Sequence, residues 1–62
     1  MKINERIYAD SLIEMVEKIQ NYFRTYDPFV YGVKQKNRPM SMIDTNGSKK
    51  WWVEMSRYQS AH

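Results

Sequence analysis

Residues 10–26 (DSLIEMVEKIQNYFRTY) constrain the fold most strongly, because their apolar side chains recur at helical spacing. Seven of them follow the i, i+3, i+4, i+7 pattern. They share about a third of the circumference of an α-helix. Ser11 and Glu14 form an S-x-x-E capping box, and Pro28 disfavours helical geometry at Asp27. We therefore predict an amphipathic helix that lays one face on a core. The seven residues are Leu12, Met15, Val16, Ile19, Tyr22, Phe23 and Tyr26.

Alternating apolar and polar side chains, separated by turn signals, predict β-strands in the rest of the chain. Asn46-Gly47 stands between two strand-like runs and favours a hairpin. Residues 37–39 (NRP) favour a turn, and residues 59–62 are expected to form a frayed tail. The predicted strands are residues 2–8, 28–36, 40–44 and 49–58.

The predicted fold class is α+β: a two-layer sandwich in the order β-α-β-β-β, with one helix packed on a mainly antiparallel four-stranded sheet. Residues 1–62 form a single small domain. We expect the last three strands to form a meander. Because the helix carries the chain back, the strand at residues 2–8 should run parallel to its neighbour. That neighbour is either the strand at 28–36 or the strand at 49–58, and the pattern leaves both possible.

In the strand predicted at residues 28–36, alternation separates the two faces. Phe29, Tyr31 and Val33 share one face and should pack on the helix. Gly32 lies on the other face, where it either marks a bulge or leaves room for a close approach by another backbone or a ligand.

One helix covers only one face of such a sheet, so the other face meets solvent or a partner. Trp51 and Trp52 are adjacent and point to opposite faces. The residues that share a face with Trp51 are more apolar than those that share a face with Trp52. We therefore expect Trp51 to lie in the core and Trp52 to be exposed. Aromatic and cationic side chains on an open face suit a protein interface or a nucleic-acid surface. The plain alternative is a solvated sheet with lysine stems against Trp52. The predicted partner-binding residues are Trp52, Tyr58, Lys34, Lys36, Arg38 and Arg57.

Length and composition limit how this chain is stabilised. With 62 residues its core is marginal without help, and the lack of cysteine excludes a disulfide framework. The chain is rich in aromatic residues and has five Met, so homodimerisation or stabilisation on a target is expected. It has no transmembrane-length apolar run and no signal-peptide pattern, which predicts a cytoplasmic protein without a membrane partner.

The charge is unevenly distributed. The net charge is +3, of which residues 1–27 contribute −1 and residues 28–62 contribute +4. The basic half is therefore the predicted β-rich half. A modest positive field favours acidic partners, either a nucleic acid or an acidic protein surface.

Catalytic and metal-binding patterns are missing from the sequence. His62 is the sole histidine and the last residue, and without Cys or a second His we expect no zinc or iron site. The carboxylates form no recognisable catalytic pair, and no phosphate-binding loop or nucleophile elbow occurs. We expect no enzymatic activity, no catalytic residue, no cofactor and no metal.

The junction between the first strand and the helix resembles a known family. Ile7-Tyr8-Ala9-Asp10-Ser11-Leu12, followed by Glu14 and Val16-Glu17, is similar to the strand-to-helix junction of the small T7-type phage inhibitors of bacterial RNA polymerase. The likeness covers about residues 6–26. It implies a class, namely small phage or mobile-element proteins that inhibit a host complex by docking on it, and it implies no functional residues.

The sequence thus favours a small non-enzymatic interaction protein that binds and inhibits or modulates a larger host protein or nucleoprotein machine. Two alternatives stay open: a nucleic-acid-binding protein that uses the same face, and a homodimer that pairs open faces or edge strands.

Overall fold

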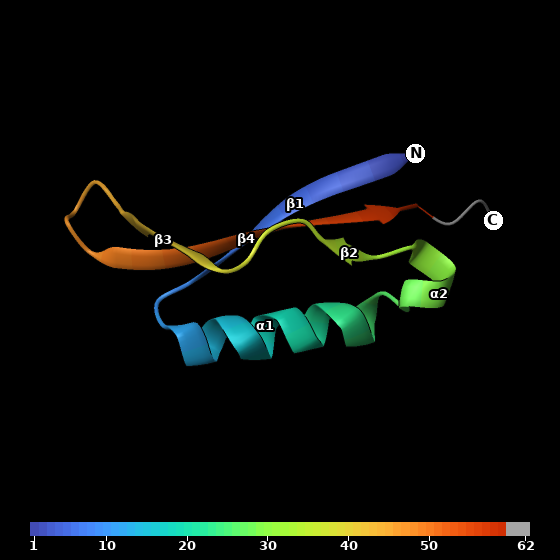
Figure 1. The fold of residues 1–62 in the computed structure, drawn as a ribbon, viewed down its shortest axis with the longest axis horizontal. Helices are drawn as coiled ribbons and strands as arrows, with labels where there is room; N and C mark the ends of the chain where they lie inside the picture. The colour runs from blue at the N-terminus through green and yellow to red at the C-terminus, as the bar shows by residue number, and fades with distance from the viewer. Residues whose placement is uncertain (60–62) are drawn as a thin grey trace.

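The computed structural model describes residues 1–59 and has an α+β fold, with one main helix packed on a four-stranded antiparallel sheet (Figure 1). A single-turn helix connects the main helix to the second strand. The elements are β1 (Lys2–Ala9), α1 (Leu12–Thr25), α2 (Pro28–Tyr31), β2 (Lys34–Gln35), β3 (Met40–Ile43) and β4 (Lys49–Tyr58).

The helix α1 begins and ends where its sequence signals predict. The Ser11 side chain accepts a hydrogen bond from the Glu14 backbone N–H at 3.1 Å, which satisfies one of the N–H groups that a helix start leaves unpaired. At the other end, the Tyr26 N–H donates to the Tyr22 carbonyl, and Asp27 and Pro28 begin the next turn. The prediction of a helix in this segment is confirmed.

Only part of the apolar stripe of α1 is buried. Met15 and Tyr22 are buried, and Ile19 packs against the core, but Leu12 and Val16 keep 47% and 46% of their surface exposed. The helix packs mainly on β1 and less on β4, so its flank on the β3 side has little sheet above it. Figure 1 shows the β3–β4 hairpin continuing beyond the first turn of α1.

The long strand β4 is the centre of the sheet. It pairs with β1 on one edge and with β2 and β3 on the other, and every pairing is antiparallel. The predicted parallel pairing of the first strand is therefore wrong. The helix does return the chain so that β1 and β2 run in the same direction, but β4 lies between them and is antiparallel to both.

The predicted meander of the last three strands is also wrong, because the chain does not reverse at residues 37–39. Both β2 and β3 run antiparallel to β4 along the same edge, so they form one interrupted strand. The Asn37 side chain fills the interruption, since its Oδ1 accepts the Glu54 backbone N–H at 2.7 Å in place of a backbone carbonyl. The seven residues from Lys34 to Met40 stand opposite five residues of β4, from Ser56 to Trp52, as in a bulge.

Residues 28–36 form a helical turn and a short strand instead of one long strand. Asp27 caps the turn by accepting the Phe29 N–H at 2.9 Å, Pro28 occupies the first turn, and Gly32 ends it in the left-handed region at φ 59°. The expected packing of Phe29 is wrong, because its side chain is fully exposed. Val33 is buried as predicted.

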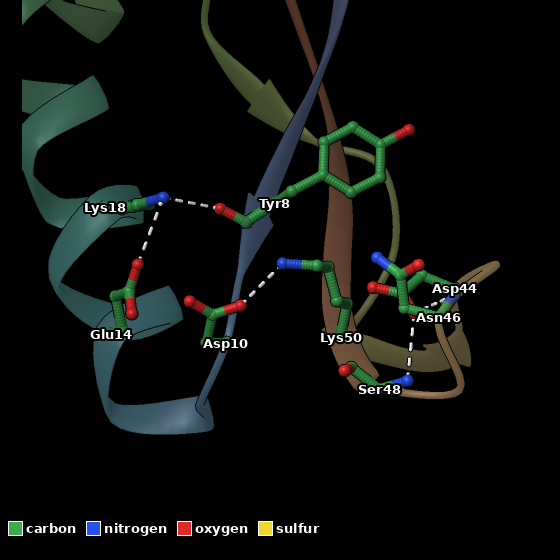
Figure 2. Close-up of polar contacts among 8 residues, drawn as sticks. All are labelled: Tyr8, Asp10, Glu14, Lys18, Asp44, Asn46, Ser48 and Lys50. Atoms are coloured by element: carbon green, nitrogen blue, oxygen red, sulfur yellow. Dashed lines mark hydrogen bonds and ion pairs between the residues drawn. The ribbon is translucent and has the colours of Figure 1, made fainter.

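The predicted hairpin is present between β3 and β4, with a wider turn than a two-residue Asn-Gly loop. The Gly47 N–H donates to the Asp44 carbonyl at 3.0 Å, and Gly47 takes a left-handed φ of 80°. Asp44 Oδ1 also accepts the N–H groups of Asn46 and Ser48, each at 2.9 Å (Figure 2). This is a type I turn followed by a left-handed glycine.

The core lies between α1 and the face of the sheet formed by odd-numbered residues of β1 and β4. Trp51 packs against this core at its edge, which is the side that the alternation favours for it. The expected tail at residues 59–62 lies outside the described residues except for Gln59, whose N–H donates to the Met1 carbonyl. The buried apolar residues are Ala9, Met15, Tyr22, Val33, Val53 and Met55.

Candidate functional site

The candidate site is the sheet face opposite α1, which we call the open face. It is formed by the even-numbered residues of β1 and β4, because odd-numbered residues of both strands face the helix. Directly opposed residues of paired strands share a face, so the register adds Lys34, Met40 and Met42. The chain continues extended to Lys36, whose N–H donates to the Glu54 carbonyl, and places Lys36 with Lys34.

A row of three large side chains crosses the open face. Tyr8 of β1 and Met40 of β3 both stand opposite Trp52 of β4. Tyr8 is 45% exposed and Met40 49% exposed. Trp52 is half-buried between them. Met42, opposite Lys50, extends the apolar surface toward the hairpin. We call Tyr8, Trp52 and Met40 the three-residue row.

Arg6 covers one side of this row. Its guanidinium carbon lies 4.6 Å from the centre of the Trp52 ring, within the range of a cation–π interaction. Its Nε also lies 3.8 Å from a Glu54 carboxylate oxygen. The arginine therefore stacks on the tryptophan and leaves only part of the ring available to a partner.

Cations outnumber acids on the open face. The two acids beside the row, Glu54 and Asp10, are paired with Arg6 and Lys50, the latter at 2.7 Å (Figure 2). The hydrogen bond from Lys50 holds the pKa of Asp10 below its ordinary value, and the same bond raises the pKa of Lys50. Among residues 1–59 the ion pairs do not include Lys2, Lys34 or Lys36. These three lysines give the face its positive charge.

Tyr58 lies at the end of the open face that is near α2. A Cβ on Gly32 would lie 3.3 Å from the Tyr58 ring, so the glycine allows the ring to approach the backbone. The group close to Gly32 is therefore a side chain, whereas the sequence predicts another backbone or a ligand there. Tyr58 remains 54% exposed, whereas Ser56, between Asn4 and Lys34, is buried.

The structure brings together four of the six predicted partner-binding residues, namely Trp52, Tyr58, Lys34 and Lys36. Arg38 lies exposed in the interruption between β2 and β3, where its carbonyl accepts the Asn37 side chain at 2.7 Å. Arg57 lies on the helix side of β4 with only 12% of its side chain exposed. It binds Glu5 and Tyr22 there.

Sequence reasoning missed the contribution of β1 and β3 to this face. The predicted partner-binding residues include no residue of β1 or β3, although Tyr8, Arg6 and Met40 lie on the open face. The alternation of residues 2–8 does indicate that Arg6 and Tyr8 share a side opposite Ile3 and Ile7. The sequence pattern does not show which strand pairs with residues 2–8. Tyr8 lies beside Trp52 only because β1 pairs with β4 in an antiparallel register.

Residues 1–59 contain no group of three or more His, Cys, Asp or Glu side chains that could hold a metal ion, and their surface contains no detected pocket. No helix in this range is long and apolar enough to cross a membrane.

Comparison with models of protein families, with curated proteins and with solved structures gives no match for this chain.

Proposed function

We propose that this chain is a small non-enzymatic interaction protein whose open face binds an acidic surface of a larger protein. One observation carries the proposal: the three-residue row, in which Tyr8 and Met40 are exposed and Trp52 is half-buried, lies among lysines that have no acidic partner within residues 1–59. Trp, Tyr, Met and Arg are enriched at protein interfaces, where a few large side chains supply most of the affinity. The resemblance to phage inhibitors makes a bacterial host complex the first choice of partner, and inhibition or modulation the expected effect.

A protein partner is favoured over a nucleic acid by the surroundings of Trp52. Stacking a base requires a free ring face, and the Arg6 guanidinium already lies over this ring at 4.6 Å. Met40 and Met42 supply flexible apolar surface, which adapts well to side chains of another protein.

The test is affinity capture from a nuclease-treated bacterial lysate with matched variants. Trp52→Ala and Lys34→Glu should each reduce the captured protein by at least about tenfold, since both alter the open face. Arg24→Glu makes the same charge change as Lys34→Glu in the last turn of α1 and should leave capture unchanged. Equal capture by wild type and both open-face variants would reject the proposal.

A nucleic acid is the second candidate, because aromatic side chains and cations occupy one sheet face. It predicts gel retardation of a single-stranded oligonucleotide at low salt, loss of binding in Lys34→Glu with Lys36→Glu, and steep weakening with added salt. Retardation together with loss of all captured protein after nuclease treatment would replace the protein proposal by this one.

A homodimer is tested separately by sedimentation at high micromolar concentration. Association that depends on Trp52 would indicate that the open faces pair with each other, and a monomer would exclude this arrangement.

A further inference from the structure

The outer edge of β1 has no pairing strand among the described residues, because the sheet ends at β1 and its other edge pairs with β4. In an antiparallel pair, successive residues direct their backbone groups alternately toward and away from the partner strand. The Met1 carbonyl accepts the Gln59 N–H, so odd-numbered positions bond toward β4. The N–H and carbonyl groups of Lys2, Asn4, Arg6 and Tyr8 therefore point outward.

A contact at Tyr8 supports this direction. The Tyr8 carbonyl accepts a hydrogen bond from the Lys18 ammonium at 2.6 Å instead of one from β4. Figure 2 shows the carbonyl directed at Lys18 while the Tyr8 ring points away from the helix. Lys18 is also paired with Glu14 at 3.2 Å. The edge thus has one carbonyl bound by a lysine and three further residues with outward backbone groups.

The charges along this edge favour one kind of occupant. Lys2 and Arg6 stand on the open-face side of β1, and Lys18 lies at its end. Arg6 also lies 3.8 Å from Glu54, but its side chain keeps 53% of its surface exposed, and Lys2 has no acidic partner within residues 1–59. The acid on the strand, Glu5, points to the helix side and is bound by Arg57 at 2.7 Å. A second copy of β1 would bring the same two cations to the edge, whereas like charges across paired strands are destabilising. An acidic strand places carboxylates beside them.

We propose that the outer edge of β1 is a strand-addition site for an extended acidic segment of the partner protein. Its backbone pairs with the outward groups of Lys2, Asn4 and Arg6, and acidic side chains at alternate positions lie beside Lys2 and Arg6. This inference rests on the proposed function, because it names the part of an acidic protein partner that docks. The added strand would extend the open face continuously.

The probe is a synthetic peptide of alternating glutamate and valine, as long as β1. Binding should slow hydrogen exchange at the Asn4 and Arg6 amides by roughly tenfold, as expected when exposed N–H groups gain partners. A lysine–valine peptide of the same length should not bind. A glutamate–valine peptide with N-methyl groups on alternate residues should bind at least about fivefold more weakly, because it lacks edge hydrogen bonds.

Asn4→Pro provides a test within the chain, since it removes an outward N–H and leaves the β4 ladder unchanged. It should weaken peptide binding by about fivefold to tenfold relative to Asn4→Ala, which keeps the N–H. If Asn4→Pro does not fold, the N-methylated peptide decides. Equal binding of the methylated and unmethylated peptides overturns the inference.

Two results separate this inference from the proposed function. Shifts at the Trp52 indole without protection of Asn4 and Arg6 overturn the edge site and leave the open face as the binding surface. Protection of these amides, with Trp52→Ala having no effect on capture from lysate, supports the edge site and rejects the open face. An oligonucleotide that binds where the peptide does not overturns the edge site.

Discussion

Arg57 and Glu5 form an ion pair across β4 and β1 on the helix side of the sheet, with Nη2 and Oε1 2.7 Å apart. The same guanidinium lies 4.0 Å from the centre of the Tyr26 ring and donates from Nε to the Tyr22 hydroxyl at 3.1 Å. One arginine therefore connects both strands to the last two turns of α1. It lies at the end of the core where the C-terminal part of α1 meets β1 and β4.

Replacing Arg57 by Met should lower the thermal unfolding midpoint by on the order of 5 °C, because the apolar stem is kept while Glu5 and Tyr22 lose their partner. Arg6→Met is the matched control on the open face, where the pair with Glu54 is longer and half-exposed. Calorimetry should show a smaller shift for Arg6→Met, since exposed ion pairs contribute little. Equal shifts would contradict the structural role of Arg57.

Two neighbouring residues of α1 test how much of the helix stripe is buried. Met15→Ala should cost roughly 2–5 kcal/mol of unfolding free energy, because the side chain is fully buried and its loss leaves a cavity. Val16→Ala should cost under about 1 kcal/mol, since Val16 is 46% exposed and alanine favours a helix. Urea unfolding measures both. A large loss of unfolding free energy in Val16→Ala would mean that the side of α1 that carries Val16 is buried.

The contrast between Met15 and Val16 shows what the sequence determines and what it leaves open. Helical spacing, the Ser11 cap and Pro28 predict α1 and the α+β class, because these signals act within a few residues. Spacing does not reveal that α1 sits toward β1, so Leu12 and Val16 were assigned to the core. That position depends on the sheet order, which pairs residues far apart in the chain.

The same reasoning explains the candidate site. Alternation around Trp52 predicts an open face and four of the residues on it. It could not supply Tyr8, Arg6 or Met40, because these depend on the register with β4. Arg57 differs from the other predicted residues, because its odd position in β4 puts it on the helix side. The partners that bind it there, Glu5 and Tyr22, are distant in sequence, so local patterns do not reveal them.

Gly32 and Gly47 both occupy the left-handed region, and alanine should cost about 1–2 kcal/mol at each. Gly32→Ala should cost more, because the new methyl group would lie 3.3 Å from the Tyr58 ring, whereas nothing lies within 4 Å at Gly47. Chemical unfolding measures how much unfolding free energy each of the two alanine variants loses. If Gly47→Ala loses more unfolding free energy than Gly32→Ala, the Tyr58 ring does not crowd a methyl group at position 32.

Asn37 should be required for the interrupted edge of β4. Asn37→Ala removes the acceptor of the Glu54 N–H and should cost about 1 kcal/mol, the net value of a typical hydrogen bond. Hydrogen exchange at Glu54 should accelerate, while exchange at Met55, which bonds toward β1, stays slow. Asn37→Asp keeps an acceptor and serves as the control. Unchanged exchange at Glu54 in Asn37→Ala would show that another group satisfies this N–H.

The Asp10–Lys50 pair joins the end of β1 to the β3–β4 hairpin, and its titration is directly measurable. The Lys50 hydrogen bond lowers the pKa of Asp10 below the ordinary 3.8, so the pair stabilises the fold above that pH and its contribution is lost as pH falls through the lowered value. Lys50→Met should return the Asp10 pKa toward 3.8 in a carboxyl NMR titration. Lys49→Met changes a neighbour that lies over the Trp51 ring and should leave Asp10 unaffected. Identical Asp10 titrations in wild type and Lys50→Met would show that the pair does not form in solution.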